Sequence, residues 1–255
     1  MVPATRRSFI LDLVKKHGAV SIPELEEALK VSPATIRRDL DMLSRQSYLR
    51  RSHGGAVVQE APTTAEPHHS LQALSMRAEK RRIGLSAATL AQDGQSLILD
   101  SSSTVLELAR ALETGRRDLT IVTNDVAIAH ALTDSRSVAA LVVTGGTLRQ
   151  GHYTLGGAAP AEMLAGLHVD VAFLGVHALD DEGASETNIE VARVKTLMAR
   201  AARRVVVLAD HSKFGLRSFT PIIALEEIDT VVTDDGVAPV VVARLRERGV
   251  TVMTG

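Results

Sequence analysis

The sequence predicts two domains of different fold class: a small all-α domain at the N-terminus, followed by an α/β domain with a mostly parallel sheet. Three helical patterns occupy roughly the first 45 residues. From about residue 76, apolar strand segments alternate with helical segments, which is typical of a parallel sheet covered on both faces. The length of 255 residues is sufficient for two hydrophobic cores. We expect domains at 1–58 and 76–255, joined by a proline-containing linker at 59–75.

The first two helices are predicted from their apolar spacing and their termini. The first helix ends at Gly18, and its expected buried face consists of Phe9, Ile10, Leu13 and Val14. The second helix follows Ser21, with Glu24 three residues later, which is the pattern of a capping box. Its expected buried face consists of Leu25, Ala28 and Leu29.

The third helix begins within the segment "VSPATIRRDLDML". Ser32 is the expected N-cap and Pro33 the first helical residue, where its missing N–H costs nothing. An apolar stripe at helical spacing must face the core and consists of Ile36, Leu40 and Leu43. Arg37 and Arg38 therefore point away from the core. Only "KVSP" separates the second helix from the third, as a helix-turn-helix requires.

The segment "SYLRRSHGGAVV" predicts two short strands around a basic turn, which would complete a winged helix-turn-helix. Such motifs place their second helix in the major groove of DNA, where arginine pairs with guanine edges or phosphates and hydroxyls contact phosphates. The charge distribution agrees, because residues 1–60 carry a formal charge of +3 although the whole chain carries −1. The candidate DNA-binding residues are Ser32, Thr35, Arg37, Arg38, Arg50, Arg51, His53 and Gly54.

Seven apolar strands are expected in the second domain, and they are "QSLILD", "LTIVT", "VAALVVTGG", "VDVAFLGV", "RVVVLAD", "DTVVTD" and "VTVMTG". The expected helices are "MRAEKRRIGLSAATLA", "STVLELARALE", "DVAIAHALT", "APAEMLAGL", "IEVARVKTLMARAA" and "APVVVARLRERG". A parallel α/β domain binds ligands at the carboxyl ends of its strands. The residues that follow each strand are therefore the ones to examine for a binding site.

Polar residues follow most of these strands. The run "DSSST" stands at a strand–helix junction, where hydroxyls and free backbone N–H groups can bind an anion. Lys195 and Lys213 supply cations, so the converging strand ends favour a small phosphorylated ligand. The candidate effector-binding residues are Asp100, Ser101, Ser102, Ser103, Thr104, Thr123, Asn124, Gly145, Gly146, His152, Glu190, Lys195 and Lys213.

At these residues the chain resembles the DeoR family of bacterial transcriptional regulators. "VSPATIRRDLDML" followed by "LRRSHGGA" is similar to the family's DNA-binding domain, with Ser47 where the family usually has glycine. The second domain is similar to the family's sensor domain, which is related in fold to ribose-5-phosphate isomerase. The similarity lies in "DSSST", "TN", "GG" and "DHSKFG", with Ser102 in place of the usual glycine. The resemblance implies a repressor of a carbohydrate-metabolism operon whose DNA binding responds to a phosphorylated sugar.

Two other hypotheses are consistent with the residues alone. A phosphosugar isomerase could use Glu190 as the acid/base group and Lys195 as the cation, and a scaffold protein would use neither. The sequence has no cysteine, which excludes disulfides and thiolate zinc sites. It also has no apolar run of about 18 residues that could span a membrane.

We therefore expect a cytoplasmic protein that is not an enzyme and needs no cofactor or metal. One short helix reads few base pairs, so we also expect a homodimer or homotetramer on a double-stranded DNA operator.

Overall fold

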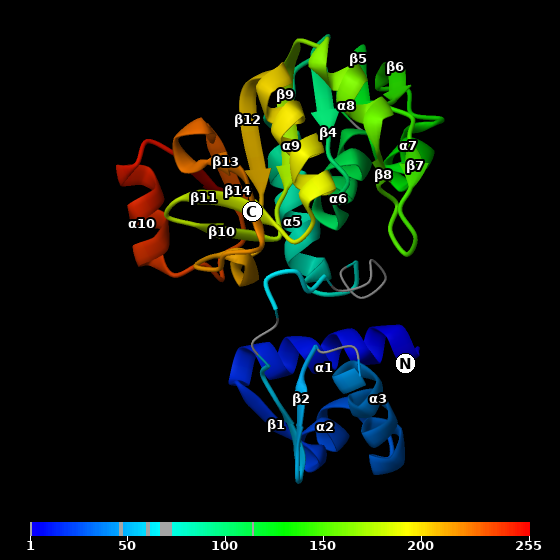
Figure 1. The fold of residues 1–255 in the computed structure, drawn as a ribbon, viewed down its shortest axis with the longest axis vertical. Helices are drawn as coiled ribbons and strands as arrows, with labels where there is room; N and C mark the ends of the chain where they lie inside the picture. Colours follow the sequence, from blue (N-terminus) through cyan, green and yellow to red (C-terminus); the bar gives the residue numbers. More distant parts are fainter. Residues whose placement is uncertain (1, 46–47, 60–61, 67–72, 114) are drawn as a thin grey trace. The chain divides into compact units, whose positions relative to one another are not determined.

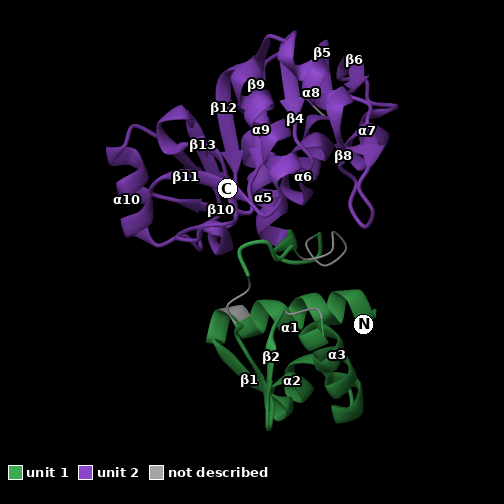
Figure 2. Ribbon diagram, viewed as in Figure 1, with its two compact units in different colours: residues 1–77 green, residues 78–255 purple. Residues whose placement is uncertain are grey.

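The computed structural model describes residues 2–45, 48–59, 62–66, 73–113 and 115–255. The chain forms two compact units, Met1–Arg77 and Ala78–Gly255 (Figure 2). Each unit has buried apolar side chains of its own. Within the described ranges, every helix is too short or too polar to cross a membrane.

In its described residues, the first unit combines three helices with a small antiparallel sheet (Figure 1). The helices are α1 (Pro3–His17), α2 (Ile22–Leu29) and α3 (Pro33–Arg45), and the strands are β1 (Ala19–Ser21), β2 (Arg50–Ser52) and β3 (Gly55–Val57). β2 and β3 form the predicted hairpin, and β1 pairs with the other edge of β3. The winged helix-turn-helix is confirmed. β1 was not predicted, because three residues are too few to show a strand pattern.

The termini of the first two helices are those that the sequence predicts. Gly18 follows α1 with a φ of 75°, which suits a residue without a side chain. Ser21 and Glu24 form the predicted capping box, because the Ser21 hydroxyl accepts from Glu24 N and the Glu24 carboxylate accepts from Ser21 N at 2.7 Å. These bonds satisfy two N–H groups that would otherwise lack partners.

The core of the first unit contains the predicted stripe of α3 in full. Its fully buried side chains are Ile10, Leu25, Ile36, Leu40, Leu43 and Leu49. Two side chains expected inside, Phe9 and Ala28, are exposed, whereas Leu11 and Ile22 are buried. The apolar faces of α1 and α2 are thus rotated slightly from the predicted ones.

The second unit is built on a seven-stranded sheet in which every neighbouring pair is parallel, as predicted. Its strands are β4 (Ser96–Leu99), β5 (Leu119–Thr123), β6 (Val138–Val143), β9 (Val169–Gly175), β12 (Ala202–Leu208), β14 (Thr230–Thr233) and β15 (Thr251–Thr254). The flanking helices are α5 (Arg77–Ala88), α6 (Ser103–Leu112), α7 (Val126–Leu132), α8 (Ala158–Ala165), α9 (Ile189–Ala201) and α10 (Pro239–Glu247). One core joins the sheet to α5, α6 and α7, and another joins its opposite face to α8, α9 and α10.

Several short elements interrupt this pattern and were not predicted. β10 (Ala178–Asp180), β11 (Gly183–Glu186) and β13 (Thr220–Ala224) form a separate antiparallel sheet. β7 (Thr147–Leu148) and β8 (Leu155–Gly156) form a small hairpin. Two single turns of 3₁₀ helix lie at His211–Lys213 and Leu225–Glu227.

The strand order of the large sheet, β15-β14-β12-β9-β4-β5-β6, places the carboxyl ends of β4 and β9 side by side. From β4 the chain proceeds through β5 to β6 in one direction, and from β9 through β12, β14 and β15 in the other. β4 and β9 therefore flank the topological switch point of the sheet. Open parallel sheets bind ligands at such a point, so the fold directs attention to the residues after these two strands.

Candidate functional site

The exposed side of α3 carries the predicted DNA-binding residues of this helix. Arg37 and Arg38 are exposed, and Thr35 is half-buried in the first turn. The Ser32 hydroxyl accepts from Thr35 N at 3.4 Å and lies 3.0 Å from the Thr35 hydroxyl. Both hydroxyls thus stand at the positive end of the helix, where anions such as DNA phosphates are stabilised.

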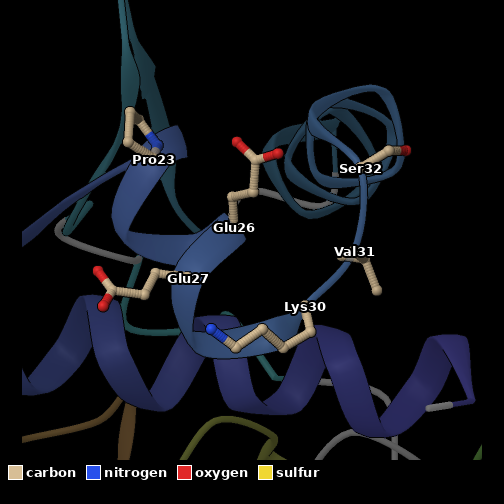
Figure 3. A pocket seen from close by; sticks show the side chains of 6 residues that line it. All are labelled: Pro23, Glu26, Glu27, Lys30, Val31 and Ser32. Carbon is tan, nitrogen blue, oxygen red and sulfur yellow. The ribbon is translucent and has the colours of Figure 1, made fainter.

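The turn before α3 is fixed by backbone geometry (Figure 3). Lys30 ends α2 in the left-handed conformation, with a φ of 53°, and its N–H donates to Glu26 O at 2.9 Å. The concave surface beside this turn is lined by Pro23, Glu26, Glu27, Lys30, Val31 and Ser32. The reversal lets α3 follow α2 after a short connection, as the helix-turn-helix requires.

A buried ionic cluster connects α3 to α1. Asp39, on the inner side of α3, accepts from the Nε of Arg6, and Arg7 Nε lies 3.4 Å from its other carboxylate oxygen. The Arg6 and Asp39 side chains are 10% and 6% exposed, so this pair is largely removed from water. The sequence analysis assigned no role to these three residues. They hold the helix that carries Arg37 and Arg38 in a defined orientation.

The β2–β3 hairpin presents the second group of predicted DNA-binding residues. Arg50, His53 and Gly54 are exposed, while Arg51 is half-buried with its Nε 3.5 Å from Asp41 on α3. The carbonyl of Gly54 accepts from Ile22 N at 2.8 Å, which ties the hairpin tip to the start of α2. Ser47, noted above, lies outside the described residues, and so does the His68–His69 pair within the predicted linker.

A buried charged triad lies at the switch point of the second unit. Lys195 on α9 places its Nζ 2.7 Å from Glu186 Oε1 and 3.1 Å from Asp100 Oδ2, and donates to Gly175 O at 2.6 Å. Gly175 N in turn donates to Asp100 Oδ2 at 3.0 Å. Two predicted residues, Asp100 and Lys195, are therefore brought together at the ends of β4 and β9.

The triad contains one cation for two carboxylates, and their pKa values reflect this. Burial raises the pKa of Asp100 to about 6 although Lys195 acts to lower it. Burial also acts to raise the pKa of Glu186, but the close Lys195 ammonium outweighs it and the pKa is lowered. For Lys195, the two carboxylates outweigh the burial, and its pKa is raised. Asp100 is the member of the triad that changes protonation most readily near neutral pH.

Glu186 was missed by the sequence analysis, which considered Glu190 with Lys195. Glu190 is exposed in the first turn of α9, while Lys195 pairs with Glu186 at the end of β11. The sequence carried no signal for Glu186, because β11 belongs to the small antiparallel sheet that was not predicted.

The predicted residues Ser101, Thr123 and Asn124 form a hydrogen-bonded network between the ends of β4 and β5. The Ser101 hydroxyl donates to Asp125 Oδ2 at 2.6 Å and lies 2.7 Å from the Thr154 hydroxyl, while Ser101 N donates to Asn124 Oδ1 at 3.0 Å. The Thr123 hydroxyl donates to Leu99 O at 2.7 Å. These hydrogen bonds hold together the loops that follow β4 and β5. Asp125, which caps α7, could have been identified from its position before a helix.

Ser102, Ser103 and Thr104 start α6 beside the triad. Ser102 is the N-cap, and its hydroxyl accepts from Thr104 N at 3.2 Å. Thr104 is buried, while Ser102 and Ser103 are half-buried. The positive end of α6 is therefore directed to the carboxyl end of β4, as the "DSSST" pattern predicts.

The ends of β12 and β14 carry a second polar group. Lys213 is half-buried and contributes to lowering the pKa of the buried Asp210 against the effect of its burial. The adjacent His211 lies with its Nδ1 2.7 Å from the buried carboxylate of Asp234, which also accepts from His211 N at 2.7 Å. Asp210, His211 and Asp234 lie outside the predicted set. They continue the row of polar strand ends from β4 and β9 across the sheet.

The remaining predicted residues lie after β6 and in the connection between β7 and β8. Gly145 and Gly146 are exposed after β6, both with positive φ. His152 is half-buried in the β7–β8 connection, where its N–H donates to Arg149 O at 3.1 Å. The hydrogen bonds described above for the triad involve none of these three residues. Among the described residues there is also no group of three or more His, Asp or Glu side chains that could hold a metal.

Comparison with known proteins identifies both units. A family model described as a DeoR-like helix-turn-helix domain matches residues 6–61, and one described as a DeoR C terminal sensor domain matches residues 75–235. The HTH-type transcriptional repressor GlcR of Bacillus subtilis (strain 168) is 37% identical over 88% of this chain and 86% of its own. The glycerol-3-phosphate regulon repressor of Escherichia coli (strain K12) is 32% identical over 92% of each chain.

Among solved structures, the chain is similar to ribose 5-phosphate isomerase A from Methanocaldococcus jannaschii, with 18% identity and a TM-score of 0.41 over 55% of each chain. The relatives that extend over most of the chain are named as transcriptional regulators, so the isomerase hypothesis receives no support from them. Both the N-terminal and the C-terminal match name the same family. The chain belongs to the DeoR family of helix-turn-helix transcriptional regulators.

Proposed function

We propose that this regulator is a repressor of a carbohydrate-metabolism operon, that it binds its operator as a homodimer or homotetramer, and that a phosphorylated sugar controls this binding. The observation that carries the proposal is the buried Asp100–Lys195–Glu186 triad at the switch point of a unit attached to a DNA-binding fold. A regulator that did not bind a ligand would have little need for charged groups there.

The DNA-binding part of the proposal rests on α3 and the hairpin. The exposed Arg37 and Arg38 lie one turn from the helix N-terminus, where side chains of this motif contact base edges. Arg50 and His53 on the hairpin suit contacts to the phosphate backbone or minor groove. Most of the affinity is expected to come from phosphate contacts, so it should fall steeply with salt.

The effector part of the proposal rests on the strand ends. α6 directs its N-terminus to the end of β4, and Lys213 supplies positive charge after β12, while Lys195 is already paired with two carboxylates. An anion bound there would be stabilised by the N-terminus of α6 and by Lys213. One relative is named as a repressor of a glycerol-3-phosphate regulon, which is consistent with a phosphorylated effector.

The proposal is tested by gel shift with the DNA upstream of the regulator's own gene, titrated with a panel of phosphorylated sugars. Specific binding that one of these compounds changes at constant salt is the expected result. Binding that no phosphorylated compound changes would contradict the effector assignment. Turnover of any of these compounds by the purified protein would instead support an isomerase activity.

Variants of α3 provide the control for DNA binding. Replacing Arg37 and Arg38 by alanine is expected to abolish sequence-specific binding while the fold persists, because both side chains are exposed. Arg45→Ala is the matched variant, since Arg45 is exposed on the last turn of the same helix, far from the turn. Equal loss from both variants would indicate a general charge effect rather than contact by the front of α3.

A further inference from the structure

Ser102 lies beside the charged triad. Its backbone is extended, with φ −159° and ψ 143°, and it immediately precedes the first residue of α6. Its hydroxyl accepts from Thr104 N at 3.2 Å, so a backbone donor of the helix N-terminus is already occupied by a neutral group of the protein itself. An incoming anion would have to compete with this hydroxyl for the same N–H.

Gly175, at the end of β9, faces the Ser102 side chain. A Cβ added to Gly175 would lie 2.1 Å from Ser102 Oγ and 2.3 Å from Ser102 Cβ, while the next atom, Asp100 Oδ2, would be 3.7 Å away. Ser102 therefore fills the space that a side chain at position 175 would take. Because Gly175 is hydrogen-bonded to both Asp100 and Lys195, this space adjoins the triad.

The triad also contains a polar atom that suits a ligand. Asp100 is 1% exposed, and its Oδ1 is buried without a hydrogen-bond partner among the described residues. A buried carboxylate oxygen is normally hydrogen-bonded. A donor group of the ligand, such as a hydroxyl, that reaches Asp100 would therefore form a hydrogen bond that the free protein lacks. Ser102 lies close to this carboxylate, because the same Cβ added at Gly175 would approach both side chains.

We propose that Ser102 is a specificity-determining residue of the effector site: its hydroxyl competes with the effector's anionic group for Thr104 N–H, and its side chain limits the size of the group admitted between β4 and β9. This inference rests on the proposed function. The site accordingly favours compact phosphorylated ligands and binds them less tightly than the free helix N-terminus would. The competition for Thr104 N–H arises from the Ser102 hydroxyl, and the size limit arises from its whole side chain. Substitutions that remove only the hydroxyl or the whole side chain therefore separate the two effects.

The experiment measures binding by calorimetry on the full chain with three probes: inorganic phosphate, glycerol 3-phosphate and ribose 5-phosphate. Ser102→Ala removes the hydroxyl and keeps the Cβ, and Ser102→Gly removes both. Each variant is expected to bind inorganic phosphate about tenfold more tightly, because a charged acceptor replaces a neutral one at Thr104 N–H. Only Ser102→Gly is expected to gain additional affinity for ribose 5-phosphate over glycerol 3-phosphate. Unchanged or weaker phosphate binding by both variants would overturn the inference.

A compensating variant tests the spatial part separately. In Ser102→Gly/Gly175→Ala, a methyl group returns to the same space from β9, with Asp100 Oδ2 at an ordinary contact distance. The preference for glycerol 3-phosphate should return to the wild-type level while the tighter binding of inorganic phosphate persists. If the double variant keeps the higher relative affinity for ribose 5-phosphate of Ser102→Gly, side-chain volume at this point does not select the ligand.

The same titrations distinguish this inference from the proposed function. If none of the three probes binds to the wild type or to any variant, the phosphorylated-effector proposal fails, and the role of Ser102 fails with it. If the probes bind and change operator binding, but every variant has wild-type affinities, only the role of Ser102 is refuted. Thermal melting of each variant confirms folding, which glycine at an N-cap permits.

Discussion

At the scale of single residues, Asp39 shows how a buried side chain can hold the helix that we propose contacts DNA. Its carboxylate is hydrogen-bonded to Arg6 and lies close to Arg7, and its side chain is only 6% exposed. Such a pair adds little net stability compared with apolar residues, but removal of one partner leaves the other charge buried and unpaired. The orientation of α3 therefore depends on a bond to α1.

Asp39→Ala is expected to lower the free energy of unfolding of the first unit by about 3 kcal/mol, because Arg6 then remains buried without its carboxylate. Urea unfolding followed by circular dichroism measures the loss. Asp41→Ala on the same helix is the control: its side chain is 56% exposed beside Arg51, so a loss below about 1 kcal/mol is expected. Similar losses from the two variants would show that the buried cluster does not hold α3.

The raised pKa of Asp100 predicts that the stability of the folded protein depends on pH. Its folded-state pKa, about 6, lies above its ordinary value of 3.8, so the folded protein binds this proton more tightly than the unfolded chain. The contribution of Asp100 is therefore fully present below about pH 4 and is lost as the pH rises through about 6, at a cost of about 3 kcal/mol. Asp100→Asn cannot ionise and should escape this loss.

The measurement compares urea unfolding of the wild type and Asp100→Asn at several pH values. The stability of the variant relative to the wild type should rise between about pH 4 and pH 6 and stay constant above that range. A difference that is the same at every pH would mean that Asp100 ionises normally in the folded protein. Glu186 titrates in both proteins, so its contribution largely cancels in the comparison.

At the scale of elements, Gly55 determines how the hairpin joins the rest of the first unit. A Cβ at this position would lie 2.0 Å from Val20 O and 2.7 Å from Ser21 Cα, both backbone atoms of β1. Only glycine lets β3 pair with β1 at this point. The neighbouring Gly54 has no atom within 4 Å of its added Cβ.

Gly55→Ala is therefore expected to separate β1 from β3 and to destabilise the first unit by about 2 kcal/mol, since backbone must move to admit the methyl group. Amide hydrogen exchange at β1 and β3 and the operator affinity should both report the change. Gly54→Ala should leave exchange unchanged, so any loss of operator binding by that variant would indicate contact of the hairpin tip with DNA. Unchanged protection in Gly55→Ala would contradict the packing described.

The long periodic elements were predictable from the sequence, whereas most of the short ones were not. The three-residue strands β2 and β3 are the exception, because a turn with Gly54 and Gly55 marks them as a hairpin. All seven strands of the parallel sheet are continuous apolar segments between helices, and the α3 stripe has clear helical spacing. β1, β7 and β8 have three residues or fewer, too few to show a period. Asp39 could not be identified because its role depends on Arg6, which is 33 residues away in the chain. Glu186 lies only nine residues before Lys195, but its strand β11 was not predicted.

At the scale of the whole molecule, a regulator with one short reading helix gains specificity by placing two copies on one operator. The half-sites of such a dimer lie about one helical turn apart on the same face of the DNA. Inserting five base pairs between them turns one half-site to the opposite face. Operator affinity should then fall to that of a single half-site, measured by gel shift, while insertion of ten base pairs should cost less. An affinity that does not respond to spacing would contradict the homo-oligomer that we propose.

The separation of α3 into an anchored side and an outward side makes this protein suitable for engineering. Ile36, Asp39 and Leu40 hold the helix, while Arg37 and Arg38 take no part in that anchoring. New side chains at the outward positions should redirect the protein to a different promoter without weakening its scaffold. The response to a phosphorylated sugar that we propose for the second unit, where Asp100 lies more than sixty residues away in the sequence, would be inherited unchanged by such a biosensor.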